Sequence, residues 1–154
     1  MPRRQWICRD GPMARLYREA PLNSVWEGTA NMMCMDVRRA MLRDPNCRDA
    51  FFAEIADVRG EDSRFDRYVE GVRPFIDEML EDEFFARRGT EALARALQGA
   101  ELLRYSTPEV IDVFIKTRLA GGTNAWGTLL GTLGRGVTQA QAAKIVERAN
   151  VTPQ

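Results

Sequence analysis

Apolar residues recur at three- and four-residue intervals along most of this chain, which is the spacing of amphipathic α-helices. The clearest run lies between Arg64 and Leu80, where the apolar positions are Phe65, Tyr68, Val69, Val72, Phe75, Ile76, Met79 and Leu80. Pro74 falls inside this run and should kink the helix or leave a gap in its hydrogen-bond ladder. We see no alternating pattern typical of a β-strand. The chain is therefore predicted to be all-α.

The same spacing predicts further helices on both sides of that run. Their expected ranges are 30–43, 48–59, 83–103, 108–119 and 138–149, with a short helix over 126–133. Breaks are expected at Asp44-Pro45-Asn46, at residues 60–63 and at Gly121-Gly122. Thr107 before Pro108 is a typical N-cap, and Thr138 with Gln141 three residues on resembles a capping box.

With 154 residues the chain has the length of one domain. We expect a single helical domain over 1–154, in which 1–28 form an irregular lead-in and 29–154 form a helical bundle. Within the lead-in, one turn of helix is expected over 13–17. The loops are short, as is usual in helical bundles.

Composition excludes several kinds of chemistry. The chain has no histidine, which removes histidine-dependent triads, histidine metal ligands and histidine acid–base catalysis. Its three cysteines are Cys8, Cys34 and Cys47, and they have no CxxC spacing. They fit a reduced cytoplasmic protein better than a disulfide scaffold or a metal site, so we expect no metal. The net charge is zero, which gives no long-range field for nucleic acid.

No apolar run approaches the roughly 20 residues of a membrane-spanning helix, and the first residues lack the apolar stretch of a signal peptide. We therefore expect a cytoplasmic protein with no membrane contact.

The segment with the most chemical content is Trp26-Glu27-Gly28-Thr29, at the expected start of an apolar helix. Partial burial of the Glu27 carboxylate against Trp26 would raise its basicity, which suits proton abstraction from carbon. Gly28 and the following N–H groups would make the helix start receptive to a phosphate. An ordinary loop explains the same residues, with Thr29 as N-cap and Trp26 packed on the helix.

These residues resemble the C-terminal helical domain of the acyl-CoA dehydrogenases, and most closely their AidB-type branch, associated with the response to DNA alkylation. The family pattern is Arg18-Glu19-Ala20, then the tetrad at 26–29, then Ala30-Asn31 and an apolar helix. The Ala-Pro-Leu-Asn-Ser stretch at 20–24 and Trp26 point to the AidB-type branch. The stretches 102–106 and 118–122 are similar to it more loosely.

The resemblance implies an FAD-dependent oxidoreductase that removes a proton from the α-carbon of an acyl-CoA thioester. It assigns that proton abstraction to Glu27. Contacts with FAD are implied for Trp26, Gly28, Thr29, Asn31 and Arg18. Two of these residues keep alternatives: Arg18 could brace the loop by pairing with Glu19 or Glu27, and Asn31 could be an ordinary amide on a helix face.

The chain departs from the family upstream of Arg18, where the Gly-Gly-x-Gly turn is missing. The N-terminal helical domain and the β-domain are also unaccounted for. We therefore expect the chain to be inactive alone, and family members suggest that it forms homo-oligomers.

Two alternatives to an enzyme stay open. The first is a non-catalytic helical module that binds DNA or a protein partner, and the last is a stand-alone bundle with an accidental motif. From residue 104 onward the chain carries a modest excess of cations, which is compatible with weak DNA binding. The cations are Arg104, Lys116, Arg118, Arg135, Lys144 and Arg148, against Glu109, Asp112 and Glu147.

Overall fold

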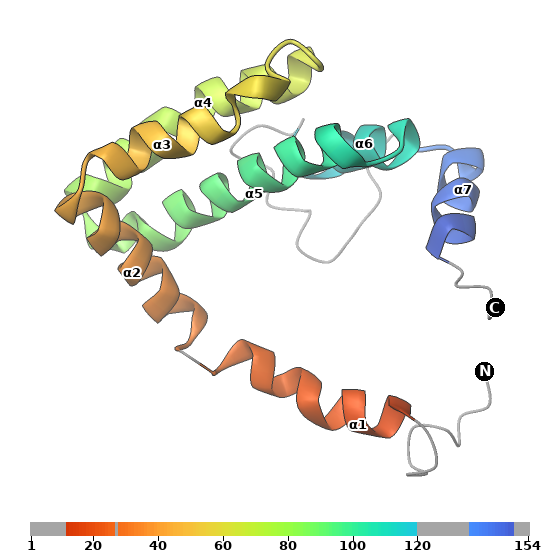
Figure 1. Ribbon diagram of the computed structural model, residues 1–154, viewed down its shortest axis with the longest axis horizontal. Helices are drawn as coiled ribbons and strands as arrows, with labels where there is room; N and C mark the ends of the chain where they lie inside the picture. Colours follow the sequence, from red (N-terminus) through yellow and green to blue (C-terminus); the bar gives the residue numbers. More distant parts are fainter. Residues whose placement is uncertain (1–11, 27, 120–135, 150–154) are drawn as a thin grey trace.

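The computed structural model describes residues 12–26, 28–119 and 136–149, and within these ranges the fold is all-α, as expected (Figure 1). The α-helices are α1 (Pro12–Glu19), α2 (Ala30–Arg43), α3 (Asn46–Glu54), α4 (Ser63–Glu81), α5 (Ala86–Tyr105), α6 (Pro108–Phe114) and α7 (Gln139–Ala149). Short 3-10 segments precede or follow three of them: η2 (Ala20–Ser24), η3 (Ala56–Val58) and η4 (Glu83–Phe85). A π-helical turn, η5 (Ile115–Leu119), continues α6.

The core lies between the two longest helices, α4 and α5, which run alongside each other in Figure 1. The α4 side contributes Phe65, Val72, Ile76 and Met79, each at most 1% exposed. Ala96 and Ala100 of α5 are fully buried opposite them. Each large apolar side chain buried in this way stabilises the fold by about 1.5–3 kcal/mol. The strong amphipathic pattern of residues 64–80 therefore marked the centre of the molecule.

Two glycines let α5 approach α4 closely. A Cβ added at Gly99 would lie 2.7 Å from the Phe65 ring, and one at Gly89 would lie 2.7 Å from the Met79 side chain. Both distances are shorter than carbon atoms tolerate, so these positions have no room for a larger residue. The interface depends on glycine at these two places.

Arginine side chains cover the C-terminal ends of two helices. Arg38 of α2 donates from Nε to the Met79 carbonyl at 2.7 Å and from Nη2 to the Leu80 carbonyl at 3.0 Å, in the last turn of α4. Arg104 of α5 donates in the same way to the Glu54 carbonyl, the last residue of α3. The last carbonyls of a helix have no partner inside the helix, and these guanidinium groups donate hydrogen bonds to them. Their positive charge also interacts favourably with the negative end of the helix dipole.

Helix α2 has the expected bounds, whereas several other boundaries differ. The expected single turn over 13–17 is part of an eight-residue helix, α1. The helix expected over 48–59 begins at Asn46 and ends as α-helix at Glu54, and the one expected from Glu83 begins with the 3-10 turn η4. In η4 the Asp82 carboxylate accepts a hydrogen bond from the Phe84 N–H at 2.9 Å, which holds that tight turn.

The expected caps were right in position but not always in chemistry. Thr138 and Gln141 form a reciprocal capping box, with distances of 3.1 Å and 3.2 Å between side chain and backbone N–H. Thr107 stands at the N-cap of α6 before Pro108, but its hydroxyl caps no backbone N–H. Helix α4 continues without interruption through Pro74, which lies on the exposed side of the helix. The helix expected over 126–133 lies outside the described residues.

The N-terminal part projects away from this core. We call α1, η2 and the described residues up to Met33 the arm; in Figure 1 it runs apart from the α4–α5 pair and joins it through α2. Large apolar side chains of the arm are roughly half exposed or more: Leu16, Tyr17, Leu22, Val25, Trp26, Met32 and Met33.

Candidate functional site

The tetrad residues that the structure describes stand where the arm meets the first turn of α2. Gly28 has a φ of +121°, a left-handed conformation that side-chain-bearing residues rarely adopt. A Cβ at this position would also lie 3.3 Å from the Met32 Cβ. Glycine is therefore required here by the backbone. Glu27, the predicted base, lies outside the described residues.

Thr29 occupies the N-cap of α2 without capping it. Its backbone is extended (φ −68°, ψ 161°) and its carbonyl accepts a hydrogen bond from the Met33 N–H at 3.1 Å, but its side chain makes no cap hydrogen bond. The first N–H groups of an α-helix have no partner inside the helix. Those of α2 are thus left for solvent or for an anionic ligand, and the positive end of the helix dipole lies beside them.

Asn31 is linked to a distant part of the chain. Its Oδ1 accepts a hydrogen bond at 2.8 Å from Nη1 of Arg87, in the first turn of α5. Both residues line an open hollow of about 480 Å³, whose other lining residues are Cys34, Met35, Asp82, Glu83, Phe84 and Ala86. Arg87 was not predicted, because a contact across 56 positions leaves no periodic signal in the sequence. The Asn31 side chain is thus exposed on α2 and borders this hollow, where it contacts Arg87.

Trp26 and Arg18 remain open to solvent in this chain. Trp26 is 58% exposed, so an indole expected to shield the carboxylate is itself uncovered. Arg18 lies in the last turn of α1 and is exposed. Of its two suggested partners, Glu19 pairs instead with Arg15, at 2.8 Å.

The described residues fit part of a phosphate-bearing cofactor such as FAD. A glycine in the left-handed region, an uncapped helix start and a guanidinium beside Asn31 are the features that admit an anionic group. No cluster of three potential metal ligands occurs in the part of the chain that the structure describes.

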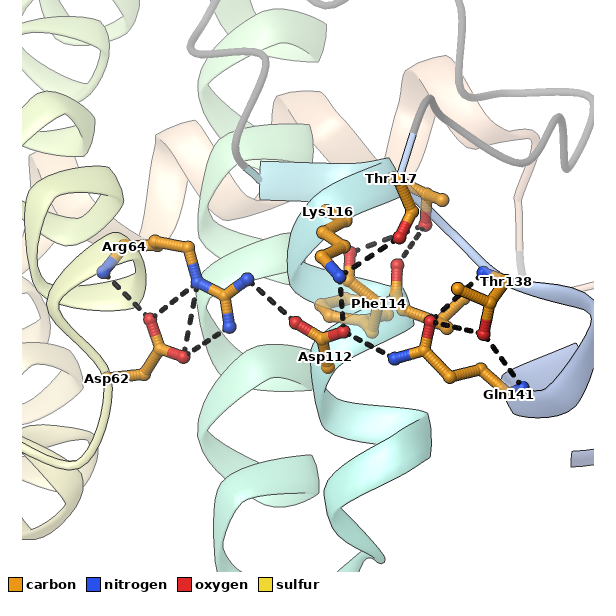
Figure 2. Close-up of polar contacts among 10 residues, drawn as sticks. Asp62, Arg64, Asp112, Phe114, Lys116, Thr117, Thr138 and Gln141 are labelled. Carbon is orange, nitrogen blue, oxygen red and sulfur yellow. Dashed lines mark hydrogen bonds and ion pairs between the residues drawn. The ribbon is translucent and has the colours of Figure 1, made fainter. Parts of the chain in front are cut away.

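A second polar cluster lies where α4, α6 and α7 meet, and Figure 2 shows its members. The Asp112 carboxylate pairs with Lys116 at 2.6 Å and Arg64 at 2.8 Å and accepts from Gln141 Nε2 at 2.7 Å. Arg64 is shared with Asp62, the N-cap of α4. Hydrogen bonds from Lys116 first, and then from Arg64, lower the pKa of Asp112 to about 2.

The charged and polar groups of this cluster pair with one another and connect α4, α6 and α7. A general base works best when its pKa lies near the working pH, and the pKa of Asp112, about 2, lies well below it. The cluster therefore serves as a junction of three helices. The only part of this cluster that the sequence predicted was the capping box of Thr138 and Gln141 at the start of α7.

The chain is all-α in its described residues, and its sequence is similar to that of an acyl-CoA dehydrogenase-type protein. A curated relative is the protein named putative acyl-CoA dehydrogenase AidB from Escherichia coli (strain K12), which is 32% identical over 112 residues. The match covers 73% of this chain and 20% of AidB, so the chain spans about a fifth of that relative's length. No family model matches the chain, and no solved structure matches it either.

The helices in the described ranges include none long and apolar enough to cross a bilayer.

Proposed function

We propose that this chain supplies one wall of an FAD-dependent acyl-CoA dehydrogenase-type site, with Glu27 as the base that removes the α-proton of an acyl thioester. The observation that carries the proposal is the tetrad at the open start of α2, in a chain related to AidB. When bound, FAD supplies the acceptor for the hydride that leaves the β-carbon. The substrate class and the role of Glu27 come from the family resemblance.

This chain's own residues have distinct tasks in the proposal. The N–H groups at the start of α2 and the Gly28 backbone admit an anionic part of the cofactor, because the Thr29 side chain does not cap them. Thr29 and Asn31 orient it, and Arg87 holds the Asn31 amide in place. Trp26 excludes water from the carboxylate of Glu27 once another surface covers the indole. Arg18, at the end of α1, is free to meet the cofactor or a second subunit.

The site is completed by another polypeptide surface in this proposal. The half-exposed Trp26 and the open hollow leave the base without the water-excluded surroundings that raise its basicity. The chain alone is therefore inactive, and its arm engages a second copy or a partner that carries the missing surface. The free thiols Cys34 and Cys47 suit a cytoplasmic location.

Binding of FAD tests this proposal directly. FAD fluorescence anisotropy is measured with the full chain and with Gly28→Ala, whose new Cβ would crowd Met32 at the open helix start. We expect weak binding to the unaltered chain, because the second surface of the site is absent, and a further loss of about tenfold in the variant. Gly60→Ala is the matched control, since Gly60 also has positive φ (+93°) but no atom within 4 Å of an added Cβ. Equal affinities in all three proteins would contradict the proposal.

A non-catalytic partner-binding module is the second candidate, and the exposed apolar side chains of the arm favour it. Binding to DNA has less support. Most C-terminal cations in the described ranges already have partners: Arg104 with Asp57, Lys116 with Asp112, Lys144 with Glu109 and Arg148 with the Ser106 hydroxyl. If a titration with DNA shows no dependence of binding on salt concentration, DNA binding is excluded as the function.

A further inference from the structure

A groove beside α4 has features of a ligand site separate from the hollow beside Asn31. It lies between the α3–η3 segment and α4, and its volume is about 210 Å³. Its floor is apolar, since Ile55 is 2% exposed and Phe65 is 1% exposed, and Val69 completes it. Groups on its rim are charged. The groove shares no lining residue with the hollow beside Asn31.

Two guanidinium groups on the rim have N–H donors without an acceptor among the described residues. The Arg59 side chain makes no hydrogen bond or ion pair with any residue that the structure describes. Arg73 stacks its guanidinium 3.9 Å from the centre of the Phe52 ring. Stacking uses the face of the guanidinium and leaves its in-plane N–H donors directed outward, in the fork that matches a carboxylate. The rim therefore offers two cationic donors above an apolar floor.

Two acidic residues on the same rim, Asp66 and Glu70, limit the number of negative charges that a ligand can carry. Both oxygens of Asp66 lie 3.2 Å from the Gly60 N–H, so that carboxylate is already engaged. Glu70 has no ionic partner among the described residues, and its charge disfavours ligands with several negative charges. The small volume, below the roughly 300–1,000 Å³ of sites for drug-sized ligands, excludes large ones.

We propose that the groove between α3–η3 and α4 binds a small monocarboxylate with a compact apolar body. The carboxylate lies between Arg59 and Arg73, and the apolar body covers Phe65 and Val69. Removing the ligand's charge must then weaken binding, because a neutral ligand gives the two guanidinium groups no charge-assisted hydrogen bond.

Titration of the full chain with phenylacetate, followed by amide NMR shifts, tests the proposal. We expect shifts at Ile55, Val69 and Arg73, and about tenfold weaker binding of the neutral phenylacetamide. Inorganic phosphate should produce no saturable shift at these residues. Equal binding of the acid and the amide, no binding of phenylacetate, or preference for phosphate would each overturn the proposal.

Two kinds of variant locate the binding. Arg59→Gln and Arg73→Gln should each weaken phenylacetate binding about five- to tenfold, whereas Arg67→Gln, an exposed arginine of α4 outside the groove, should leave it unchanged. Ala56→Phe fills the groove from an exposed position and should abolish binding without altering any charge. Ala53→Phe is its control outside the groove. Binding that survives in Ala56→Phe, or that falls equally in Arg67→Gln, contradicts the assignment.

Discussion

At the scale of single residues, charged side chains do structural work that an amphipathic pattern does not indicate. Arg38 and Arg104 satisfy carbonyls at the ends of α4 and α3, and Asp112 joins α4, α6 and α7. Hydrogen bonding to Asp57 is the first cause of the raised pKa of Arg104. These residues fix the position of one helix against another, which contacts between apolar faces alone do not fix as closely.

Replacement of Asp112 should change how stability depends on pH. The pKa of Asp112 in the folded chain, about 2, is below its ordinary value of 3.8, so its contribution is present above about pH 4 and is lost as the pH falls toward 2. Asp112→Asn should therefore be less stable at pH 7 by about 0.5–1 kcal/mol, a modest value because solvent screens this partly exposed cluster. Urea unfolding at pH 7 and at successive pH values down to 2 measures this difference.

The difference between Asp112→Asn and the unaltered chain should shrink between pH 4 and pH 2. Asp36→Asn is the control, since Asp36 is exposed and its one ion pair among the described residues is with Arg39 of the same helix. A difference that stays constant over this range would show that the ion pairs of Asp112 do not stabilise the fold.

At the scale of elements, the close contact of α4 and α5 organises the molecule. It depends on Gly89 and Gly99, whose missing side chains admit Met79 and Phe65. The cost of glycine in a helix interior, about 1 kcal/mol relative to alanine, is thus offset by packing.

Gly99→Ala should destabilise the fold although alanine is the better helix former. The new Cβ would meet the Phe65 ring at 2.7 Å, and that ring is only 1% exposed and cannot move aside easily. Overpacking costs about 1–3 kcal/mol, and subtracting the gain in helix propensity of about 1 kcal/mol leaves a net loss of about 0–2 kcal/mol. Because the Phe65 ring lies in a closed core, we expect a loss in the upper half of this range. Denaturant unfolding measures it, with the exposed neighbour Gln98→Ala as a neutral control. An unchanged or raised stability in Gly99→Ala would contradict this packing.

The helices that the sequence predicted well are those whose ends carry local signals. The range 30–43 agrees with α2 because Pro45 follows it, and Thr138 with Gln141 marked the start of α7. The short 3-10 segments and the π-turn after Phe114 were not predicted, since they have no distinct residue spacing and depend on packing.

The candidate site was predictable only in part, for the same reason. The tetrad and its neighbours lie together in sequence, so Gly28 and Thr29 could be placed at a helix start. Arg87 joins them from another helix and carries no motif. The expectation that Trp26 shields Glu27 stays a prediction, because Trp26 is half exposed here and Glu27 lies outside the described residues.

At the scale of the whole molecule, the arm is the feature that one chain alone does not explain. Its apolar side chains are exposed although α4 and α5 form a well-buried core nearby (Figure 1). Exposed apolar patches of this kind are typical of interaction surfaces. The arm also includes Trp26 and Gly28, so an interface formed by the arm would lie next to the proposed site.

Polar substitutions on the arm should reduce self-association. We expect the unaltered chain to be oligomeric, and the double variant Leu16→Ser with Val25→Ser to shift toward monomer by at least about tenfold in dissociation constant, because buried apolar area drives association. Sedimentation equilibrium measures the change. Leu42→Ser, which alters an exposed leucine at the other end of α2, should leave the mass distribution unchanged. A monomeric unaltered chain would contradict this role of the arm.

The central claim is that Glu27 is the base of a flavin site to which this chain contributes one wall. It is tested most directly in a chimeric protein, in which this chain, Glu27 included, replaces the segment of AidB from Escherichia coli that it is similar to. Bleaching of the flavin absorbance by an acyl-CoA is measured with Glu27 and with Glu27→Gln. We predict that both chimeras retain FAD and that the substitution slows bleaching by about 10²–10⁴-fold, as expected for loss of a general base. Equal bleaching rates, or a folded chimera that retains no FAD, would contradict the account.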